Sequence, residues 1–477
     1  MDQNTRTVRI IFSKDKIQII EQSKIRQGGW EKVTTNELSV AKVFHKVLNK
    51  GRVEEIFEKS DYEVLGKMLY EILTANSEVK DFIEMLIDRS TKLGDIRYKV
   101  MLQFDGDTHE LAGLPWEYLL VPVRSKDSSF YLSSGKNMQF DFVRDYDLKD
   151  LPEPPKVQLA DKLSVIWIFV GERRVETEAK MDFTKCEAVF NLLIKKGTKE
   201  VGGEQVKKFE YFKVKDPTRA KLKNILAQVI DIIGGPYVLH FLGHAEMRRN
   251  DGPYIGLSSG GDLVDWVKAN GFTEMFKKGA DPLPLPQMVV LQACESAQIN
   301  EKGEGLALGL IHQGIPAVVA MQNEISLDSS LAFIREFYTN ILSGDDVAFA
   351  LTKCRFFLGC NYPKEDPNPD HHYVNNIFGT PVLFTSVGDE KIQLIHVPQE
   401  TGAKAKTVKV CNACSKTYSA DFYMDSCVMP NCNGTLIERV ESDSPNVSGA
   451  AVREASPRHP GPSAASFTSN LRGNGLS

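Results

Sequence analysis

Short apolar runs alternate with amphipathic stretches across residues 155–386. Apolar runs bounded by polar or glycine-containing segments indicate buried strands, and apolar residues at helical spacing indicate helices. The predicted strands cover residues 162–170, 209–214, 237–242, 288–293, 317–320 and 381–385. The predicted helices cover residues 178–195, 217–233, 263–278, 305–312, 327–341 and 346–358. Six strands alternating with helices predict an α/β fold with a mainly parallel six-stranded sheet covered on both faces.

The first 150 residues have a mixed pattern that predicts an α+β region. Its expected elements are strands at residues 7–12 and 98–104, helices at 62–74 and 79–93, and a short helix at 114–119. Three prolines within residues 148–155 interrupt any regular element. We therefore expect residues 1–150 to form one region and residues 155–386 another.

The C-terminal end of the chain divides into three segments. Residues 387–405 are expected to be a linker, and residues 406–440 contain a cluster of four cysteines. Residues 441–477 are rich in Ser, Pro, Gly and Asn and cannot bury a core, so we expect a disordered tail.

Composition and charge exclude several classes of protein. With 42% hydrophobic and 25% charged residues, the chain is typical of a globular protein. The net charge of -5 gives no bulk attraction to nucleic acid or to membranes. Its apolar runs are too short to span a bilayer, and its first residues lack the apolar core of a signal peptide. We therefore expect a cytoplasmic protein that does not bind membranes.

His244 and Cys294 are the candidate catalytic residues. Each follows one of the predicted strands, at residues 237–242 and 288–293. Parallel strands deliver their last side chains to one edge of a sheet, where open α/β folds bind ligands. A histidine and a cysteine at that edge are the minimum for cysteine nucleophilic catalysis. Taken singly, each is more often structural, the histidine as a hydrogen-bonding group and the cysteine as a small hydrophobe.

The residues around this pair resemble those of a known family. Gln292-Ala293-Cys294, with a histidine about 50 positions upstream, is similar to a caspase signature. Five separated segments resemble a CHAT domain, a caspase-like peptidase domain of the caspase and separase clan. They are LPWEYL (114–119), LHFLGH (239–244), LQACESA (291–297), GIPAVVAM (314–321) and FGTPVLF (378–384). The resemblance covers about residues 95–386.

The resemblance implies a caspase-like endopeptidase that cleaves protein substrates. It implies that Cys294 is the nucleophile and His244 its partner, whereas His240 is structural. It also implies that residues 1–150 are a candidate pseudo-protease half. Many such proteins are regulated effectors in bacterial defence, so we expect an activating or scaffold protein partner.

Oxyanion binding is expected from the backbone N–H groups of Ala245 and Cys294. Caspase-like enzymes usually have glycine where this chain has Ala245, but alanine keeps the N–H group. Gln292 matches a caspase residue that lines the substrate pocket. Glu295 and Glu246 are further pocket candidates, and their charge favours basic or uncharged substrate residues.

The cysteine cluster predicts one structural zinc ion. Its ligands would be Cys411, Cys414, Cys427 and Cys432, in the pattern C-x2-C-x12-C-x4-C. Two short loops that supply two thiolates each can build a tetrahedral site, and the metal would supply most of the folding energy of this zinc ribbon. The alternative is four unliganded structural cysteines. No cofactor is expected for catalysis.

Two other functions are compatible with these motifs. One is a catalytically weak caspase-like scaffold that binds protein partners through its zinc ribbon, which the departure at Ala245 would favour. The other is a zinc-ribbon nucleic-acid factor, which would need a basic stripe that the sequence does not show. We therefore do not expect direct binding of nucleic acid.

Overall fold

A computed structural model gives the structure of the chain in two units, Met1–Gln399 and Glu400–Ser477. The described residues are 4–13, 16–21, 24–29, 59–92, 96–105, 108–123, 128–134, 139–146, 156–176, 180–201, 204–248, 251–276, 282–300, 302–360, 377–396, 406–413, 417–419 and 436–441. Within these residues no helix is both long enough and apolar enough to cross a bilayer.

The first unit is built on one mixed sheet, and all six strands predicted for residues 155–386 belong to it. In spatial order these are β11 (Phe209–Lys215), β8 (Leu163–Phe169), β12 (Tyr237–Leu242), β16 (Met288–Gln292), β17 (Ala317–Met321) and β18 (Pro381–Thr385). The first five are mutually parallel and β18 is antiparallel to β17. The prediction of a mainly parallel α/β sheet is confirmed.

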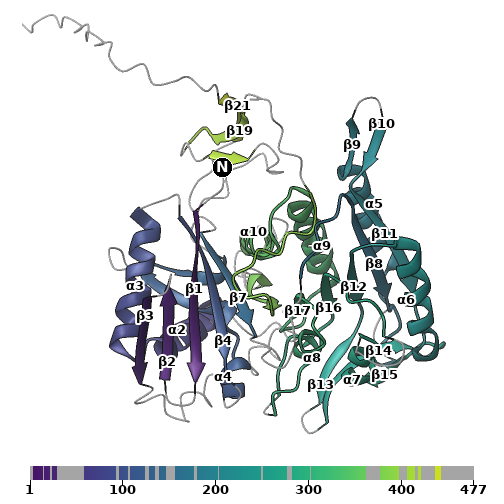
Figure 1. Cartoon of the computed structure of the whole chain (residues 1–477), viewed down its shortest axis with the longest axis horizontal. Helices are drawn as coiled ribbons and strands as arrows, with labels where there is room; N and C mark the ends of the chain where they lie inside the picture. Colours follow the sequence, from purple (N-terminus) through teal and green to yellow (C-terminus); the bar gives the residue numbers. More distant parts are fainter. Residues whose placement is uncertain are drawn as a thin grey trace, which may run out of the picture. The chain divides into compact units, whose positions relative to one another are not determined.

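The N-terminal strands extend this same sheet beyond β18. In spatial order they are β7 (Phe140–Asp145), β4 (Ile96–Phe104), β1 (Asn4–Ser13), β2 (Lys16–Glu21) and β3 (Lys24–Gly29). The join is a parallel pairing of β18 with β7, so strands from both sides of residue 155 form one 11-stranded sheet (Figure 1). The expected break at residues 148–155 lies outside the described residues.

Helices cover both faces of the sheet because successive strand residues alternate between them. In β8, Val165 and Trp167 join the core on one face, and Ile166 and Ile168 join the core on the other. The first face is covered by α5 (Phe183–Lys196), α9 (Leu327–Leu342), α10 (Val347–Cys360), α2 (Lys59–Leu73) and α3 (Ser77–Lys92). The second is covered by α6 (Arg219–Ile233), α7 (Ala269–Thr273) and α8 (Leu306–His312).

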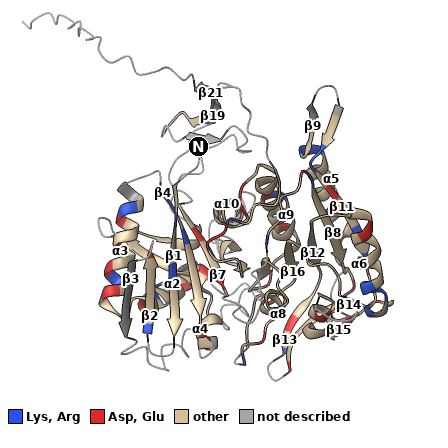
Figure 2. Ribbon diagram, in the orientation of Figure 1, with Lys and Arg blue, Asp and Glu red and all other residues tan. Residues whose placement is uncertain are grey.

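Charged residues of both signs occur on α3, α5 and α6 (Figure 2).

Further short elements of the unit are α4 (His109–Ala112), η2 (Trp116–Tyr118), η3 (Leu132–Ser134), and two hairpins. The hairpins are β5 (Leu120–Val123) with β6 (Ser128–Tyr131) and β9 (Thr198–Val201) with β10 (Glu204–Lys207).

The helix predicted between β12 and β16 differs from the structure. A second, antiparallel sheet lies here, formed by β13 (Ala245–Arg248), β14 (Gly252–Ser258) and β15 (Val264–Lys268). The helix predicted over residues 263–278 is wrong in its first part and begins only at α7, with η5 (Glu274–Phe276) after it. The reason is cross-strand pairing: Val267 of β15 lies opposite Ile255 of β14, and both are buried.

The predicted linker is also wrong over residues 387–396. Ile392, Leu394 and Ile395 are buried in the first unit, and Ile395 forms an isolated β-bridge with Ala160. Burial of these apolar side chains outweighs the freedom that a linker would keep. Residues 397–405 lie outside the described residues.

The second unit contains a small antiparallel sheet in the order β20 (Thr417–Ser419), β19 (Lys406–Cys411) and β21 (Leu436–Glu441). Cys411 ends β19 and is buried. Cys414, Cys427 and Cys432, and the predicted tail from residue 442 onward, lie outside the described residues. Of the four cysteines of the predicted zinc site, only Cys411 therefore lies within the described residues.

Candidate active site

Four neighbouring parallel strands end at one edge of the sheet, and each is followed by a residue whose side chain can ionise. In spatial order the strands are β8, β12, β16 and β17. They are followed by Glu172, His244, Cys294 and Glu324 respectively. Ligands of open α/β sheets bind outside the carboxyl ends of the strands, so this edge is the candidate active site.

The sheet brings His244 and Cys294 together by register. Leu242, the last residue of β12, pairs with Gln292, the last residue of β16. Each candidate catalytic residue therefore lies two positions beyond a pair of matched strand ends. The amide of Gly243 also donates to the carbonyl oxygen of Gln292 at 3.2 Å, which keeps the two chains side by side past the strands. The expectation that one edge carries both residues is met by the topology.

The imidazole of His244 is oriented by a backbone group. Its Nε2 lies 2.8 Å from the carbonyl oxygen of Glu172. A carbonyl oxygen only accepts hydrogen bonds, so Nε2 carries the proton and Nδ1 of the neutral ring is the basic nitrogen. The Glu172 carboxylate is itself held, because it accepts from the Ser258 hydroxyl at 2.5 Å and from the amide of Ser259 at 2.9 Å.

The thiol of Cys294 is half-buried, and burial raises its pKa above the ordinary value of 9.0. A hydrogen bond from the backbone N–H of Ile325 and the positive charge of Arg174 act in the opposite direction. The carboxylates of Glu324 and Glu295 add to the rise. The resting thiol therefore keeps its proton at neutral pH, and a base must remove it before the sulfur can attack a carbonyl.

Glu295, the residue after the candidate nucleophile, has a left-handed backbone conformation. Its φ is 60°, which is unfavourable by about 1–2 kcal/mol for a residue with a Cβ. The turn is fixed on both sides. The Ser296 hydroxyl donates to Leu291 and accepts from the amide of Met321, and a Glu295 carboxylate oxygen accepts from the amide of Met247 at 3.2 Å. Backbone strain held in this way is a feature of functional sites.

Ala245 begins β13, and its amide is oriented away from the neighbouring strand. The amide of Gly256 donates to the carbonyl oxygen of His244 at 2.9 Å, and Ala245 is opposite Ile255. In this register Ala245 and Ile255 form a non-hydrogen-bonded pair, so the N–H of Ala245 is directed outward from β14. That direction is compatible with the expected oxyanion role.

Gln292 does not line a substrate pocket, which corrects the expectation from the sequence. It is 1% exposed, and its side chain bonds His240 at 2.8 Å and the carbonyl oxygen of Ser330 at 3.0 Å. His240 also contacts the Tyr338 hydroxyl at 2.9 Å. Burial lowers the pKa of His240 to about 3, so this histidine is a neutral structural group.

The other pocket candidates are nearer the surface. Glu246, on β13, pairs with Arg248, whose guanidinium lies 3.9 Å from the centre of the Tyr254 ring. Burial raises the pKa of Glu295, and the charges of Glu324 and Glu246 act in the same direction. These carboxylates are therefore close enough to influence one another, but Glu246 and Glu324 each have an arginine partner.

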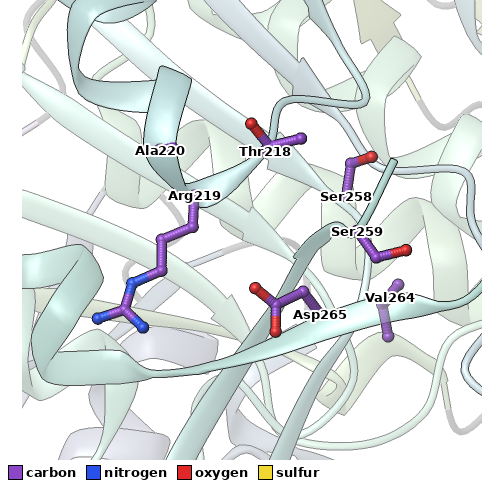
Figure 3. A pocket seen from close by; sticks show the side chains of 7 residues that line it. All are labelled: Thr218, Arg219, Ala220, Ser258, Ser259, Val264 and Asp265. Atoms are coloured by element: carbon purple, nitrogen blue, oxygen red, sulfur yellow. The ribbon is translucent and has the colours of Figure 1, made fainter. Parts of the chain in front are cut away.

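A shallow pocket of about 700 Å³ lies beside Ser258 and Ser259 (Figure 3). It is lined by Thr218, Arg219, Ala220, Ser258, Ser259, Val264 and Asp265. Ser258 and Ser259 are the residues that hold the Glu172 carboxylate. The pocket thus adjoins the support of the candidate active site but includes neither His244 nor Cys294.

Sequence reasoning missed Glu172 and the segment of residues 322–325. Glu172 acts through its carbonyl oxygen, which every residue has, so its type carries no signal. Its position did carry a signal, because Glu172 closely follows β8, which neighbours β12, the strand that precedes His244.

A model of the CHAT domain family matches residues 63–372, which is more than half of the chain and includes both candidate catalytic residues. The chain belongs to the CHAT domain family. Its resemblance to this family is thereby confirmed, and membership supports a caspase-like cysteine peptidase at the level of the family. No curated protein matches this CHAT domain chain.

Several solved structures are similar to this CHAT domain chain. Separase from Saccharomyces cerevisiae, in its complex with securin, is 10% identical over 80% of this chain, with a TM-score of 0.43. The match spans 30% of the separase chain. The initiator caspase Dronc from Drosophila is 9% identical over 50% of this chain and 94% of its own, with a TM-score of 0.31. Caspase-1 from Spodoptera frugiperda is 10% identical over 54% and 98% respectively, with a TM-score of 0.33.

Proposed function

We propose that this CHAT domain protein is a cysteine endopeptidase in which Cys294 attacks a peptide carbonyl and His244 transfers the proton. The observation that carries the proposal is the shared position of the two residues, each two positions beyond the matched ends of β12 and β16. The hydrogen bond from His244 Nε2 to Glu172 supports it, because it leaves Nδ1 as the base.

The reaction follows from these groups. Nδ1 of His244 takes the thiol proton, and the sulfur of Cys294 forms a bond to the carbonyl carbon. The oxygen then carries the negative charge and is stabilised by the N–H groups of Ala245 and Cys294. Imidazolium returns the proton to the leaving nitrogen as the C–N bond breaks, which gives a thioester. His244 next deprotonates water, which attacks the thioester and releases the acid product and the thiol.

We propose protein substrates with basic or uncharged residues at the cleavage site. The carboxylates of Glu295 and Glu324 act on the thiol, and that of Glu246 acts on Glu295, so together they favour a positive charge over a negative one. Their pairing with Arg174, Arg248 and a backbone amide reduces this field, so uncharged residues are also accepted.

We propose that a protein partner activates this effector. The resting thiol has a raised pKa, so its sulfur is a poor nucleophile until a bound substrate or partner changes its surroundings. An activating partner that brings His244 within hydrogen-bond distance of the thiol would raise the rate without altering the fold.

We further propose one structural zinc ion in the second unit. Cys411 is buried at the end of β19, and its sulfur accepts a hydrogen bond from the amide of Ala413 at 3.4 Å. A sulfur that receives a backbone N–H is suited to carry the negative charge of a metal-bound thiolate. Cys414, Cys427 and Cys432 would complete the site. Metal analysis should find one zinc ion per chain and less in Cys411→Ser, whereas zinc-free protein purified without chelator would refute the site.

Cleavage can be tested directly on proteins. The wild-type chain is incubated with a denatured protein mixture, and new amino termini are identified by mass spectrometry. We expect termini that are absent with Cys294→Ala and enriched after basic or uncharged residues. Identical termini from both proteins would count against the proposed function.

A further inference from the structure

The segment LPWEYL at residues 114–119 has no role in the chemistry described so far. It includes η2, which belongs to the N-terminal half of the first unit. The side chains of Trp116, Glu117 and Tyr118 are all fully buried. Tyr118 accepts a hydrogen bond from the segment that follows β17, and Glu117 is linked to the same segment through Arg144. This segment contacts the candidate nucleophile.

The first connection is a single buried hydrogen bond. Asn323 donates from Nδ2 to the hydroxyl oxygen of Tyr118 at 2.8 Å, and both residues are 0% exposed. The Tyr118 ring packs edge-on against Phe378, with ring centres 5.5 Å apart. Gly379 lies so close to this ring that an added Cβ would be 2.5 Å from it. The hydroxyl therefore has little freedom to move.

The second connection runs through Arg144 of β7. Its guanidinium is paired with the Glu117 carboxylate and also donates to Oε1 of Gln322 at 3.2 Å. Gln322 then donates from Nε2 to the carbonyl oxygen of Gly379. A buried arginine that is satisfied by several partners is a rigid support, because breaking any one contact leaves an unpaired polar group.

The segment of residues 322–325, which these hydrogen bonds hold in place, contacts the turn around Cys294. The amide of Ile325 bonds the thiol of Cys294. Gln298, at the other end of the turn, donates to the carbonyl oxygen of Gln322 at 3.4 Å. Glu324 pairs with Arg174 at 3.4 Å. Residues anchored by the N-terminal half thus hold the nucleophile from two sides.

We propose that Tyr118 and Arg144 are positioning residues for Cys294, acting through Asn323 and Gln322. The N-terminal half of the sheet is then part of the machinery that prepares the thiol, rather than an inert neighbour. This inference rests on Cys294 as the proposed nucleophile. The reactivity of its thiol can nevertheless be measured without any cleavage assay.

The variant Tyr118→Phe isolates the first connection. It removes one oxygen atom, keeps the packing against Phe378 and leaves Nδ2 of Asn323 without its acceptor. Residues 322–325 then relax, and the N–H of Ile325 no longer bonds the sulfur in its best geometry. Loss of a hydrogen bond to a thiolate raises the thiol pKa, so less thiolate is present at a given pH.

The matched control is Tyr131→Phe. Tyr131 packs on the same Phe378 ring, with centres 4.6 Å apart, and within the described part of the chain its hydroxyl has no hydrogen-bond partner. Removal of this oxygen should leave the segment of residues 322–325 unchanged.

The experiment measures the rate of alkylation of Cys294 by iodoacetamide between pH 6 and 10, with the adduct located by peptide mass spectrometry. We expect Tyr118→Phe to slow the reaction roughly tenfold at neutral pH, which corresponds to a rise of about one unit in the thiol pKa. Tyr131→Phe should follow the wild type. A Tyr118→Phe profile that matches the wild type would overturn the inference, and it would leave the proposed peptidase untouched.

Asn323→Ala provides a second, independent variant. We propose that the Tyr118 hydroxyl acts on Cys294 through Asn323 alone. Cys294 should therefore be alkylated at the same reduced rate in Asn323→Ala and in the double variant that combines Asn323→Ala with Tyr118→Phe. Additive effects of the two substitutions would overturn the proposed route. If Tyr118→Phe proves unfolded, Asn323→Ala alone decides: a slowed profile supports the inference and a wild-type profile refutes it.

Discussion

Nε2 of His244 donates a hydrogen bond to the backbone carbonyl oxygen of Glu172 at 2.8 Å. This main-chain carbonyl oxygen orients the imidazole, a role that a carboxylate has in a serine protease triad. The Glu172 carboxylate accepts hydrogen bonds from Ser258 and Ser259, which anchor this residue. The support of the candidate catalytic histidine therefore includes the anchoring of the Glu172 peptide group.

Glu172→Ala should weaken catalysis without abolishing it. The carbonyl oxygen remains, but the residue loses the two hydrogen bonds that fix its side chain, and the buried Ser258 hydroxyl and the Ser259 amide lose their acceptor. We expect stability to fall by about 1–3 kcal/mol and the rate of substrate cleavage to fall roughly tenfold. Kinetics and urea unfolding measure the two effects. The exposed Glu176, altered to Ala, is the control; equal rates in both variants would contradict the anchoring role.

His240→Phe should change the pH dependence of stability. The folded-state pKa of His240 is about 3, below the ordinary 6.5, because the ring is buried. Between these values the unfolded chain binds a proton that the folded chain does not, so stability declines as pH falls from 6.5 toward 3. The decline reaches at most about 1.4 kcal/mol per pH unit.

The phenylalanine variant lacks this proton-linked decline. It should be less stable at pH 7, because Gln292 and Tyr338 lose their partner, but the gap from the wild type should narrow at lower pH. Urea unfolding at pH 7, 6 and 5 provides the comparison. Parallel curves for the two proteins would show that His240 is not held neutral.

The buried Glu117–Arg144 pair should matter far more than a surface pair. Their side chains are 0% and 2% exposed, and Glu117→Gln leaves the guanidinium without its counter-charge. We expect a loss of about 3–5 kcal/mol in the free energy of unfolding. Lys180 and Asp262 are 52% and 67% exposed, so Lys180→Met should cost less than about 1 kcal/mol. Similar losses in urea titrations would contradict this ranking.

Gly379→Ala tests the close approach to Tyr118. A Cβ at this position would lie 2.5 Å from the ring, so the ring or the strand must shift. Overpacking of this kind costs about 1–3 kcal/mol, and the melting temperature should fall accordingly. At Gly235 an added Cβ has only a carbonyl oxygen at 3.9 Å, so Gly235→Ala should melt within about one degree of the wild type. Equal melting temperatures for the two variants would show that the Tyr118 contact is loose.

The main sheet could be predicted from the sequence because buried parallel strands are continuous apolar runs. The run at residues 237–242, for example, is β12 without a shift at either end. The same reasoning placed His244 and Cys294 at one edge, since each follows such a run. It failed at β15, where pairing of Val267 with Ile255 decides the structure and has no local signal.

The parts of the candidate site that could not be predicted depend on contacts between distant segments. The support of His244 comes from a carbonyl oxygen, and that of Cys294 comes from the amide of Ile325, groups that every sequence provides. Gln292 was misassigned because a family position was transferred without regard to its side-chain partner, His240. The contact of Tyr118 with Asn323 spans 205 positions and leaves no trace in either local pattern.

The central claim is that Cys294 is a nucleophile activated by His244. The most direct measurement is labelling of the chain with a peptide that carries a thiol-directed electrophile at its scissile carbonyl, followed by peptide mass spectrometry. We expect an adduct on Cys294, loss of that adduct in Cys294→Ala, and a rate lowered at least tenfold in His244→Ala at neutral pH. An adduct that forms equally fast without His244, or only on other cysteines, would show that His244 does not activate Cys294.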